Sequence, residues 1–427
     1  MRAVLWLVGL FAVAVALALF AGDNDGTVTI FWPPHRVDLS ANLVLLLLAL
    51  LFVLVYAALR TFAAVVELPR QARRWRAQQR ERATYGQLIE AMIQLSAGRY
   101  LRARKAAEDA LAREQAMSAS GEPLPQGASV RALSHLTVAA SAHSLQDKTL
   151  RDTHLNKALE ACLRSSTPQE LRDGLHMRAA RWALDDQEPQ RSLAWLDRLP
   201  QGASRRTLAL RIKLKAARQA QQSAAALETA RLLAKHRAFS PAAARSLLRS
   251  LASELIDTSH DPAQLQSIWN SLDAAERAMP ELALKAAQRM LELDGEHGMV
   301  REWLRPVWDQ MMAMPEAFAD VHGVRLVRVL EAGMTLKDDV GEREWLARIE
   351  AAQQANPRDA TLQYLAGMAC LHRQLWGRAQ LLLSQATRHL QDDSLRRSAW
   401  RALAQLAEQR GDVEQAAQAW KRAAQES

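Results

Sequence analysis

An uncharged apolar run, followed at once by a block of arginines, constrains this sequence more than any other feature. From Leu43 to Leu59 no residue is charged, and Leu45–Leu48 contains only leucine. A helix of this length rises about 26 Å, which approaches the ~30 Å hydrocarbon thickness of a bilayer. Because backbone amides in lipid must be hydrogen-bonded within the chain, the run predicts a membrane-spanning helix over about 43–59.

Positive charge is concentrated directly after this run. The basic side chains that we expect beside the membrane are Arg70, Arg73, Arg74, Arg76, Arg80 and Arg82. Such an excess marks the cytoplasmic side of a span, and anionic headgroups attract it. We therefore predict a basic stalk helix over 65–83, interrupted at Pro69, with the rest of the chain in the cytoplasm. A docking site for a partner protein is the other interpretation of the arginines.

A second apolar run occupies residues 1–21 and is charged only at Arg2. One interpretation is a secretory signal that is cleaved near Gly22. The run is longer than a usual signal core, and an arginine-flanked span follows it, so we favour a retained span over about 3–21. The two spans then form a transmembrane hairpin over residues 1–64.

The loop of this hairpin, residues 22–42, is predicted to lie outside. It contains the strand-like run Thr27–Trp32, which ends at Pro33 and Pro34. Aromatic side chains are common at membrane interfaces, so we expect Phe31 and Trp32 to lie near the lipid headgroups.

Length and composition favour helices in more than one unit. The chain has 427 residues, and it is 49% hydrophobic but only 5% aromatic. Alanine and leucine supply most of the apolar residues, and both favour helix. The net charge of +9 lies partly in the arginine block, so we expect a membrane and not nucleic acid as its counterpart. Cys162 and Cys370 are expected to be buried thiols.

Paired amphipathic segments recur at both ends of the remaining chain. Glycine makes the turn, small residues let two antiparallel helices approach closely, and large residues fill the seam. This spacing resembles the tetratricopeptide repeat of about 34 residues. The positions that we expect to pack the repeats are Gly98, Tyr100, Ala103, Ala110, Gly367, Ala379, Ala386, Trp400, Ala404, Gly411, Ala416 and Trp420.

Prolines divide the middle of the chain, where the repeat pattern is blurred. They are roughly 32 to 42 residues apart in the series Pro168, Pro200, Pro241, Pro280, Pro315 and Pro357. Each interval holds about two helices, which suits an irregular solenoid. A long coiled coil is the other helical interpretation, but the heptads that it needs are absent. We predict an all-α fold, in which a transmembrane hairpin and a stalk precede a tetratricopeptide-like helical solenoid over 84–427.

The sequence holds no motif with catalytic or metal-binding spacing. His135, His143 and His154 are spread over two predicted helices, and H-E-x-x-H, C-x-x-C and C-x-x-C-H are absent. We expect surface or core histidines, no catalytic or metal-binding residues, and no enzyme activity. Three carboxylate pairs are expected to cap helices; they are Asp185-Asp186, Asp338-Asp339 and Asp392-Asp393.

The order of these features carries a family resemblance. An apolar start is followed by Gly26-Thr-Val-Thr-Ile30, the second span, the arginine block, and Gln94-Leu95 before Gly98-Arg-Tyr100. In this order the chain resembles the HemY-type membrane-anchored repeat proteins of proteobacteria, which are associated with late haem synthesis. The resemblance implies a multi-pass protein of the bacterial inner membrane with a periplasmic loop and a cytoplasmic repeat domain. It implies no reaction, and the G-x-G-x-x-G turn of flavin enzymes is absent.

Three hypotheses of function follow. The first is a scaffold or adaptor that binds partner proteins on its repeat surface, and the resemblance implies late haem-biosynthesis enzymes as these partners. The second is a haem or porphyrin carrier or sensor at the inner membrane. The third is an enzyme hidden in the poorly patterned middle. We adopt the first, with no resident cofactor predicted. The sequence leaves the oligomeric state and the residues of the binding groove open.

Overall fold

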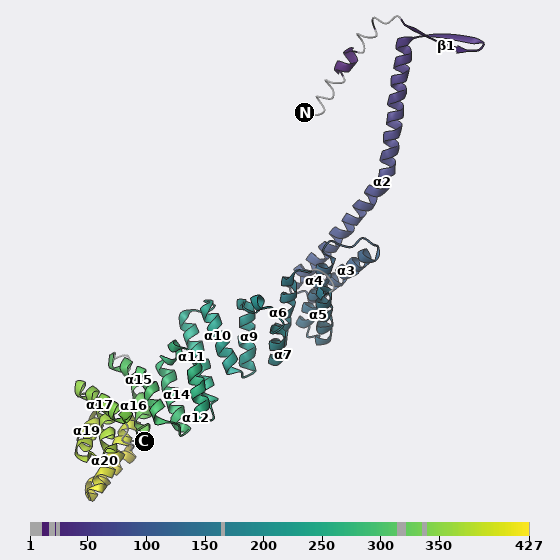
Figure 1. Cartoon of the computed structure of the whole chain (residues 1–427). Coiled ribbons are helices and arrows are strands. Elements are labelled where there is room, and N and C mark those ends of the chain that lie inside the picture. The colour runs from purple at the N-terminus through teal and green to yellow at the C-terminus, as the bar shows by residue number, and fades with distance from the viewer. Residues whose placement is uncertain are drawn as a thin grey trace. The chain divides into compact units, whose positions relative to one another are not determined.

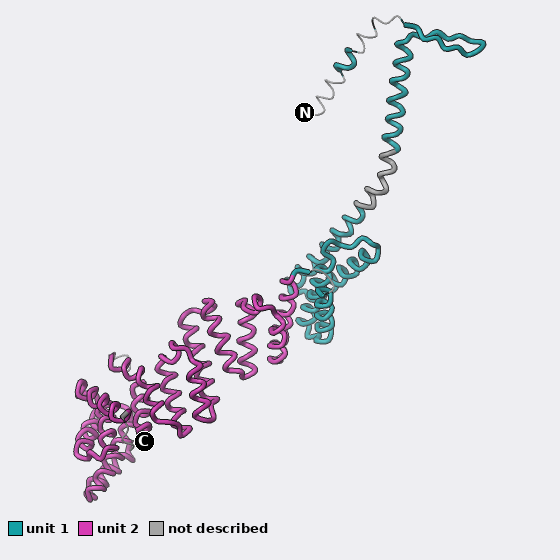
Figure 2. Tube along the Cα trace, in the orientation of Figure 1, with its two compact units in different colours: residues 1–168 teal, residues 169–427 magenta. Residues whose placement is uncertain are grey.

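The chain folds into two compact units, Met1–Pro168 and Gln169–Ser427 (Figure 2). The computed structural model describes residues 11–16, 22, 26–163, 167–313, 322–334 and 340–426, and of residues 63–74 and 340 it describes only the backbone. Helices form almost all of this described part, as the prediction of an all-α fold requires, and one small β-hairpin is the exception (Figure 1).

The hairpin consists of β1 (Thr27–Trp32) and β2 (His35–Ser40), joined at Pro33 and Pro34. The strands are antiparallel, and their register runs from Thr27 opposite Ser40 to Trp32 opposite His35. The predicted strand-like run is β1. Its partner β2 was not predicted, because His-Arg-Val-Asp-Leu-Ser mixes charged and apolar residues in a way that is also common in loops.

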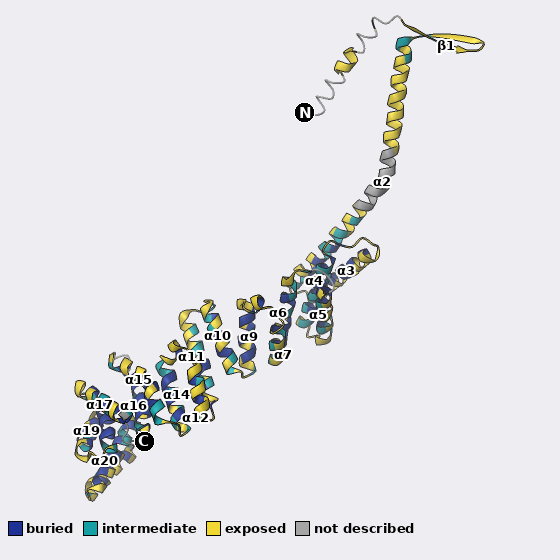
Figure 3. Ribbon diagram, in the orientation of Figure 1, coloured by how far each residue is buried: buried dark blue, intermediate teal, exposed yellow. Residues whose placement is uncertain are grey.

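Helix α2 (Ala41–Ser96) follows the hairpin directly and is 56 residues long. Ser40 caps it, since its side-chain oxygen accepts a hydrogen bond of 3.3 Å from the Leu43 N–H. Within the described residues, Ala41–Phe62 is the one helical segment long and apolar enough to cross a membrane, and none of its most apolar window is buried. The predicted span 43–59 lies inside this segment, and Figure 3 colours nearly all of this part of α2 as exposed.

The predicted first span, 3–21, lies mostly outside the described residues; the part that is described, 11–16, is helical. The interruption predicted at Pro69 is wrong, because α2 continues through this residue. The predicted limits at 64 and 83 fall inside the same helix, and as domain limits they stay predictions.

The last four turns of α2 begin the helical repeats of the first unit. Thr84, Leu88 and Ala91 are buried there and belong to a helix that packs against α3 (Tyr100–Ala119) and α4 (Gly127–Ser144). Helix α5 (Lys148–Leu163) then packs against α4. One continuous helix therefore supplies both the apolar segment and the first helix of the first repeat.

The second unit is a stack of helices in which most helices pack against their neighbours in sequence. Contacts also join alternate helices, such as α14 with α16 and α16 with α18, which is the arrangement of a helical solenoid. Its helices are α6 (Gln169–Asp185), α7 (Pro189–Leu196), α8 (Gln201–Ser204), α9 (Thr207–Gln219), α10 (Ser223–Lys235), α11 (Pro241–Asp257), α12 (Pro262–Ser271), α13 (Ala274–Arg277), α14 (Pro280–Glu292), α15 (His297–Ala313), α16 (His322–Ala332), α17 (Val340–Ala355), α18 (Ala360–His372), α19 (Trp376–His389), α20 (Asp393–Gln409) and α21 (Val413–Gln425).

One tight turn recurs between paired helices. The central residue of this turn has a positive φ. The backbone N–H groups of this residue and of the next one donate to carbonyl oxygens of the preceding helix, as in a Schellman motif. Buried residues, mostly small, lie seven positions before and five after this centre. The clearest sets, with the centre in the middle, are Ala91–Gly98–Ala103, Ala180–Gln187–Ser192, Gly367–Gln374–Ala379 and Ala404–Gly411–Ala416.

Candidate functional site

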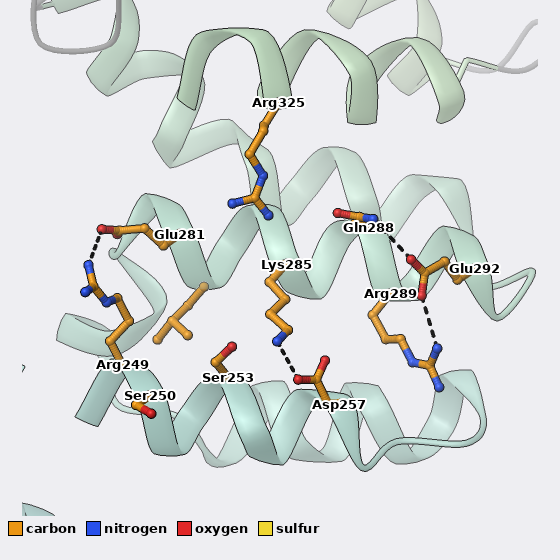
Figure 4. Close-up of a pocket in the computed structure, with 11 residues that line it drawn as sticks. Arg249, Ser250, Ser253, Asp257, Glu281, Lys285, Gln288, Arg289, Glu292 and Arg325 are labelled. Carbon is orange, nitrogen blue, oxygen red and sulfur yellow. Dashed lines mark hydrogen bonds and ion pairs between the residues drawn. The ribbon is translucent and has the colours of Figure 1, made fainter. Parts of the chain in front are cut away.

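A pocket of about 440 Å³ lies on the second unit, where α11, α14 and α16 meet (Figure 4). Its lining is almost entirely polar and charged. The residues are Arg249, Ser250, Ser253, Asp257, Glu281, Leu282, Lys285, Gln288, Arg289, Glu292 and Arg325. We call it the α11–α14–α16 groove.

Helix α14 supplies most of the lining because it has two unlike faces. Leu282, Ala286 and Met290 are buried in the core of the unit. Glu281 and Lys285 are one turn apart on the other side and face the groove, as Figure 4 shows. The helical period of 3.6 residues separates the two sets. The core face therefore fixes the direction in which the charged face points.

Two ion pairs connect α11 to α14 across the floor of the groove. Arg249 Nη1 lies 2.8 Å from Glu281 Oε1, and Lys285 Nζ lies 2.5 Å from Asp257 Oδ2. Burial alone raises the pKa of Glu281, but a backbone hydrogen bond and the Arg249 guanidinium outweigh it and lower this pKa. All four side chains keep substantial exposure. Such partly exposed pairs contribute little stability, so a ligand can exchange with them at small cost.

Arg325 is the fourth cation of the groove. It extends from α16 toward the space above Lys285 (Figure 4). Arg289 is bound on both sides, by Glu292 Oε2 at 3.0 Å and by the Ser259 carbonyl oxygen at 2.8 Å. In the described part of the chain, Arg325 makes no ion pair. Among the residues that the structure describes, the groove thus presents one guanidinium outside an ion pair, and this group suits a carboxylate with two parallel hydrogen bonds.

The charged and hydroxyl side chains of the groove suit the binding of a charged ligand. Its described lining includes no histidine or cysteine, but it includes the carboxylates of Asp257, Glu281 and Glu292. Sequence reasoning named none of these residues. On α14, charges at helical spacing were the available signal, but any solvated helix face gives the same pattern.

The residues predicted to pack the repeats are mostly in the helix seams, and their role in packing stays a proposal. Ala103, Ala110, Gly367, Ala379, Ala386, Ala404 and Ala416 are buried. Gly98 and Gly411 are exposed in the turns, at φ 73° and 77°. Tyr100 and Trp400 are half-buried, and the Arg422 guanidinium lies 4.7 Å from the Trp400 ring. Trp420 is 38% exposed and donates to Glu408, so it lies at the edge of its seam.

The arginine block lies along α2. Arg76, Arg80 and Arg82 are exposed, and Arg80 lies 3.9 Å from Glu122. The side chains of Arg70, Arg73 and Arg74 lie outside the described residues. As a membrane-facing set, the six stay a prediction.

Two of the histidines examined in the sequence meet in the first unit. His135 Nδ1 lies 3.1 Å from His154 Nδ1. Burial, with the charges of His154, Lys157 and Arg131, lowers the pKa of His135 to about 4. His143 lies separately, 3.2 Å from an Arg151 Nη1 atom. Among the described residues, no three histidines, cysteines or carboxylates are placed to hold a metal ion.

The capping predicted for the carboxylate pairs is confirmed at Asp392 and stays a prediction at the other two pairs. Asp392 caps α20 by accepting a hydrogen bond of 2.9 Å from the Leu395 N–H. Asp185 instead ends α6, so it lies at a helix C-terminus. Asp338 and Asp339 lie outside the described residues.

Comparison with known proteins supports the family resemblance for the N-terminal part. Residues 26–123 match the family model described as the HemY protein N-terminus, which confirms the predicted resemblance to HemY-type proteins there. No curated protein matches the chain. The segment includes the β-hairpin, α2 and α3, and it ends before the groove.

Two solved structures show only a distant likeness. The structure of Naa15/Naa10 bound to HypK-THB has 11% sequence identity and a TM-score of 0.25; the match covers 78% of this chain and 57% of that one. The TPR domain of P58(IPK) has 14% identity and a TM-score of 0.22, with 77% and 99% covered. Scores this low carry no argument about function, and the fold described above rests on the chain's own helices.

Proposed function

We propose that this protein is a membrane-anchored scaffold that binds partner proteins in the α11–α14–α16 groove, and that the partners include late haem-biosynthesis enzymes. The observation that carries the binding part is the guanidinium of Arg325, which makes no ion pair with any described residue and lies above a floor of exchangeable ion pairs. The haem connection is supported by the match of residues 26–123 to the HemY N-terminal model.

The anchoring part of the proposal rests on α2. Its segment Ala41–Phe62 has a mean hydropathy of 2.8 and is exposed, which is costly in water and favourable in lipid. The arginines that follow indicate that the repeat units face the cytoplasm. The first apolar run adds a second span in this proposal, so that both ends of the hairpin are cytoplasmic.

The helical solenoid gives this anchor an extended binding surface. Helices α11, α14 and α16 pack side by side and present their polar faces to the same groove. A partner segment that carries a carboxylate can pair with Arg325 and displace Glu281 or Asp257 from their present partners. Repeat proteins commonly use such concave surfaces for binding.

Site-specific cross-linking tests the binding site. A photo-cross-linking amino acid at Ser250, which is exposed in the groove, should capture partner proteins in intact cells, and the same group at exposed Gln405 on α20 is the control. Arg325→Glu should abolish capture at Ser250, whereas Arg325→Lys should retain part of it. Equal capture from both positions, or capture unaffected by Arg325→Glu, would refute the groove as the site.

Mass spectrometry of the captured proteins tests the haem connection separately. We expect enzymes of late haem synthesis among those that depend on Arg325. A Soret band in the purified protein that saturates at one equivalent would instead support a haem carrier.

The arginine block is tested by charge. Replacing Arg73, Arg74 and Arg76 with lysine keeps the charge, so the repeat units should stay cytoplasmic; replacing them with glutamine should impair insertion or invert it. A lysine variant that inserts correctly but loses its partners would show that the stalk itself is the docking site.

A further inference from the structure

The β-hairpin has two chemically different faces. Residues directly opposite each other in an antiparallel pair have side chains on the same face, so Val28 shares a face with Leu39, and Ile30 with Val37. Side chains alternate along each strand, which adds Trp32 to this face. We call Val28, Ile30, Trp32, Val37 and Leu39 the apolar hairpin face; His35 lies opposite Trp32 at its tip.

The other face is polar, and its groups bond one another. The Thr29 hydroxyl donates to Asp38 Oδ1 at 2.6 Å, and Arg36 Nε donates to the same oxygen at 3.3 Å. The Arg36 guanidinium also lies 5.4 Å from the centre of the Phe31 ring. Apart from Phe31, which is 73% exposed, this face is polar and suits water. Phe31 and Trp32 therefore lie on opposite faces of the hairpin, so the expectation that both lie near the headgroups holds here for Trp32 alone.

The apolar hairpin face is uncovered in the described part of the chain. Trp32 is 77% exposed, and Ile30 and Val37 are 48% and 47% exposed. A two-stranded hairpin alone is marginally stable in water and needs its apolar face packed against something. An exposed face of this kind marks an interaction surface.

The attachment of the hairpin decides what covers this face. Ser40 is both the last residue of β2 and the cap of α2, so no linker separates them. The Ala41 N–H also donates to the Gly26 carbonyl oxygen at 2.7 Å, which closes the base of the hairpin against the first turn of α2. Strands of six residues reach about 20 Å. The whole hairpin is thus held beside the outer end of the apolar segment, as can be followed in Figure 1.

We infer that the apolar hairpin face binds the outer lipid surface of the membrane, with Trp32 among the headgroups and the Thr29–Asp38 face toward water. This inference rests on the membrane anchoring proposed above. Lipid fits because the hairpin joins the exposed apolar segment Ala41–Phe62 without a linker, and because tryptophan favours the interface. The hairpin then anchors at the membrane interface and fixes how deeply the apolar segment of α2 lies in the bilayer.

Spin-label accessibility in the full chain tests this placement. The background is Cys162→Ala with Cys370→Ala, since both native thiols are buried. Single cysteines at Val28, Ile30 or Val37 report the apolar hairpin face, and matched ones at Thr27 or Phe31 report the polar face. In phosphatidylcholine–phosphatidylglycerol vesicles, the ratio of oxygen to nickel-complex accessibility should be several-fold higher at the first set than at the second.

A label at Leu47 in α2 separates failure of the inference from failure of the anchor. Lipid accessibility at Leu47 with equal, water-like values on both hairpin faces would overturn the inference and leave the anchor standing. A water-accessible Leu47 would overturn both. Dipolar broadening between Ile30 labels of two molecules, without lipid access, would assign the face to a second copy of the chain and likewise overturn the inference.

A measurement without labels guards against disturbance of the hairpin. Lipids brominated near the headgroup should quench a component of the tryptophan emission in the native protein, and Trp32→Phe should remove part of that component. An unchanged quenched component in Trp32→Phe would place Trp32 away from lipid and refute the inference.

Discussion

Gly367 in α18 is the position where one methyl group should have the largest effect on the repeat seam. A Cβ built there would lie 2.8 Å from Leu383 Cγ, 2.9 Å from Leu383 Cδ2 and 3.3 Å from the Leu383 backbone nitrogen. Leu383 is fully buried, so it cannot swing away, and α18 and α19 must separate. Such overpacking costs about 1–3 kcal/mol. Alanine recovers about 1 kcal/mol of helix propensity, which leaves Gly367→Ala destabilising by about 1 kcal/mol.

Gly377 is the matched control, because it is also helical and nothing lies within 4 Å of the Cβ position. Gly377→Ala should therefore show a propensity gain alone, and the gain should be below the ~1 kcal/mol of a helix interior because Gly377 lies in the first turn of α19. Unfolding of a chain with two units is not a single two-state step, so hydrogen exchange of the α18 and α19 amides is the suitable assay. Increased protection in Gly367→Ala, equal to that in Gly377→Ala, would refute the close approach.

Three further outcomes are expected. Gln374→Gly should raise the free energy of opening of α18 and α19, measured by hydrogen exchange, by about 0.5–1 kcal/mol. Gln374 has φ 60°, and the left-handed region is costly for residues with a Cβ. Stability should fall as the pH drops from about 6.5 to about 4, because the unfolded chain then binds a proton that folded His135 resists, and chemical denaturation of His135→Leu should show a flatter profile. Ala404→Leu should destabilise α20 and α21 by ~1–3 kcal/mol, since Ala404 is fully buried, whereas exposed Gln405→Leu should be nearly silent in the same assay.

The terminal repeats were predictable because their turns contain the residue that the backbone needs. Gly98 and Gly411 occupy left-handed turns, and the sequence identified both. In the middle of the chain the same turn is made by Gln187 and Gln221, at φ 61° and 55°. A glutamine gives no turn signal, so the repeats there were blurred in the sequence although the backbone geometry is the same.

Proline was an equally uneven guide. Pro241 and Pro280 begin α11 and α14 as their first residues, where the missing N–H costs nothing. Pro69 was expected to interrupt a helix, and Pro306 drew no expectation, yet both lie inside helices. An interior proline costs about 3 kcal/mol. In α15, Trp303 and Leu304 are buried beside Pro306, and their packing offsets this cost. The residues around a proline in the sequence do not reveal such packing.

The groove was beyond sequence reasoning for a different reason. Arg249, Lys285 and Arg325 come from three helices, and each lies on a helix whose charged face also looks like ordinary solvated surface. What makes Arg325 distinctive is that nearby carboxylates are already paired with other cations. That distinction depends on which helices pack together, and blurred repeats between α11 and α16 left this packing open.

Helix α2 continues without a break from the apolar segment into the first repeat. An ordinary membrane anchor reaches its soluble part through a linker, which lets the two parts rotate independently. Here the backbone is helical from Ala41 to Ser96, and its far end is fixed by Leu88 and Ala91, which are buried in the first unit. One helical backbone therefore joins the apolar segment to the helix that packs against α3, and no separate linker lies between them.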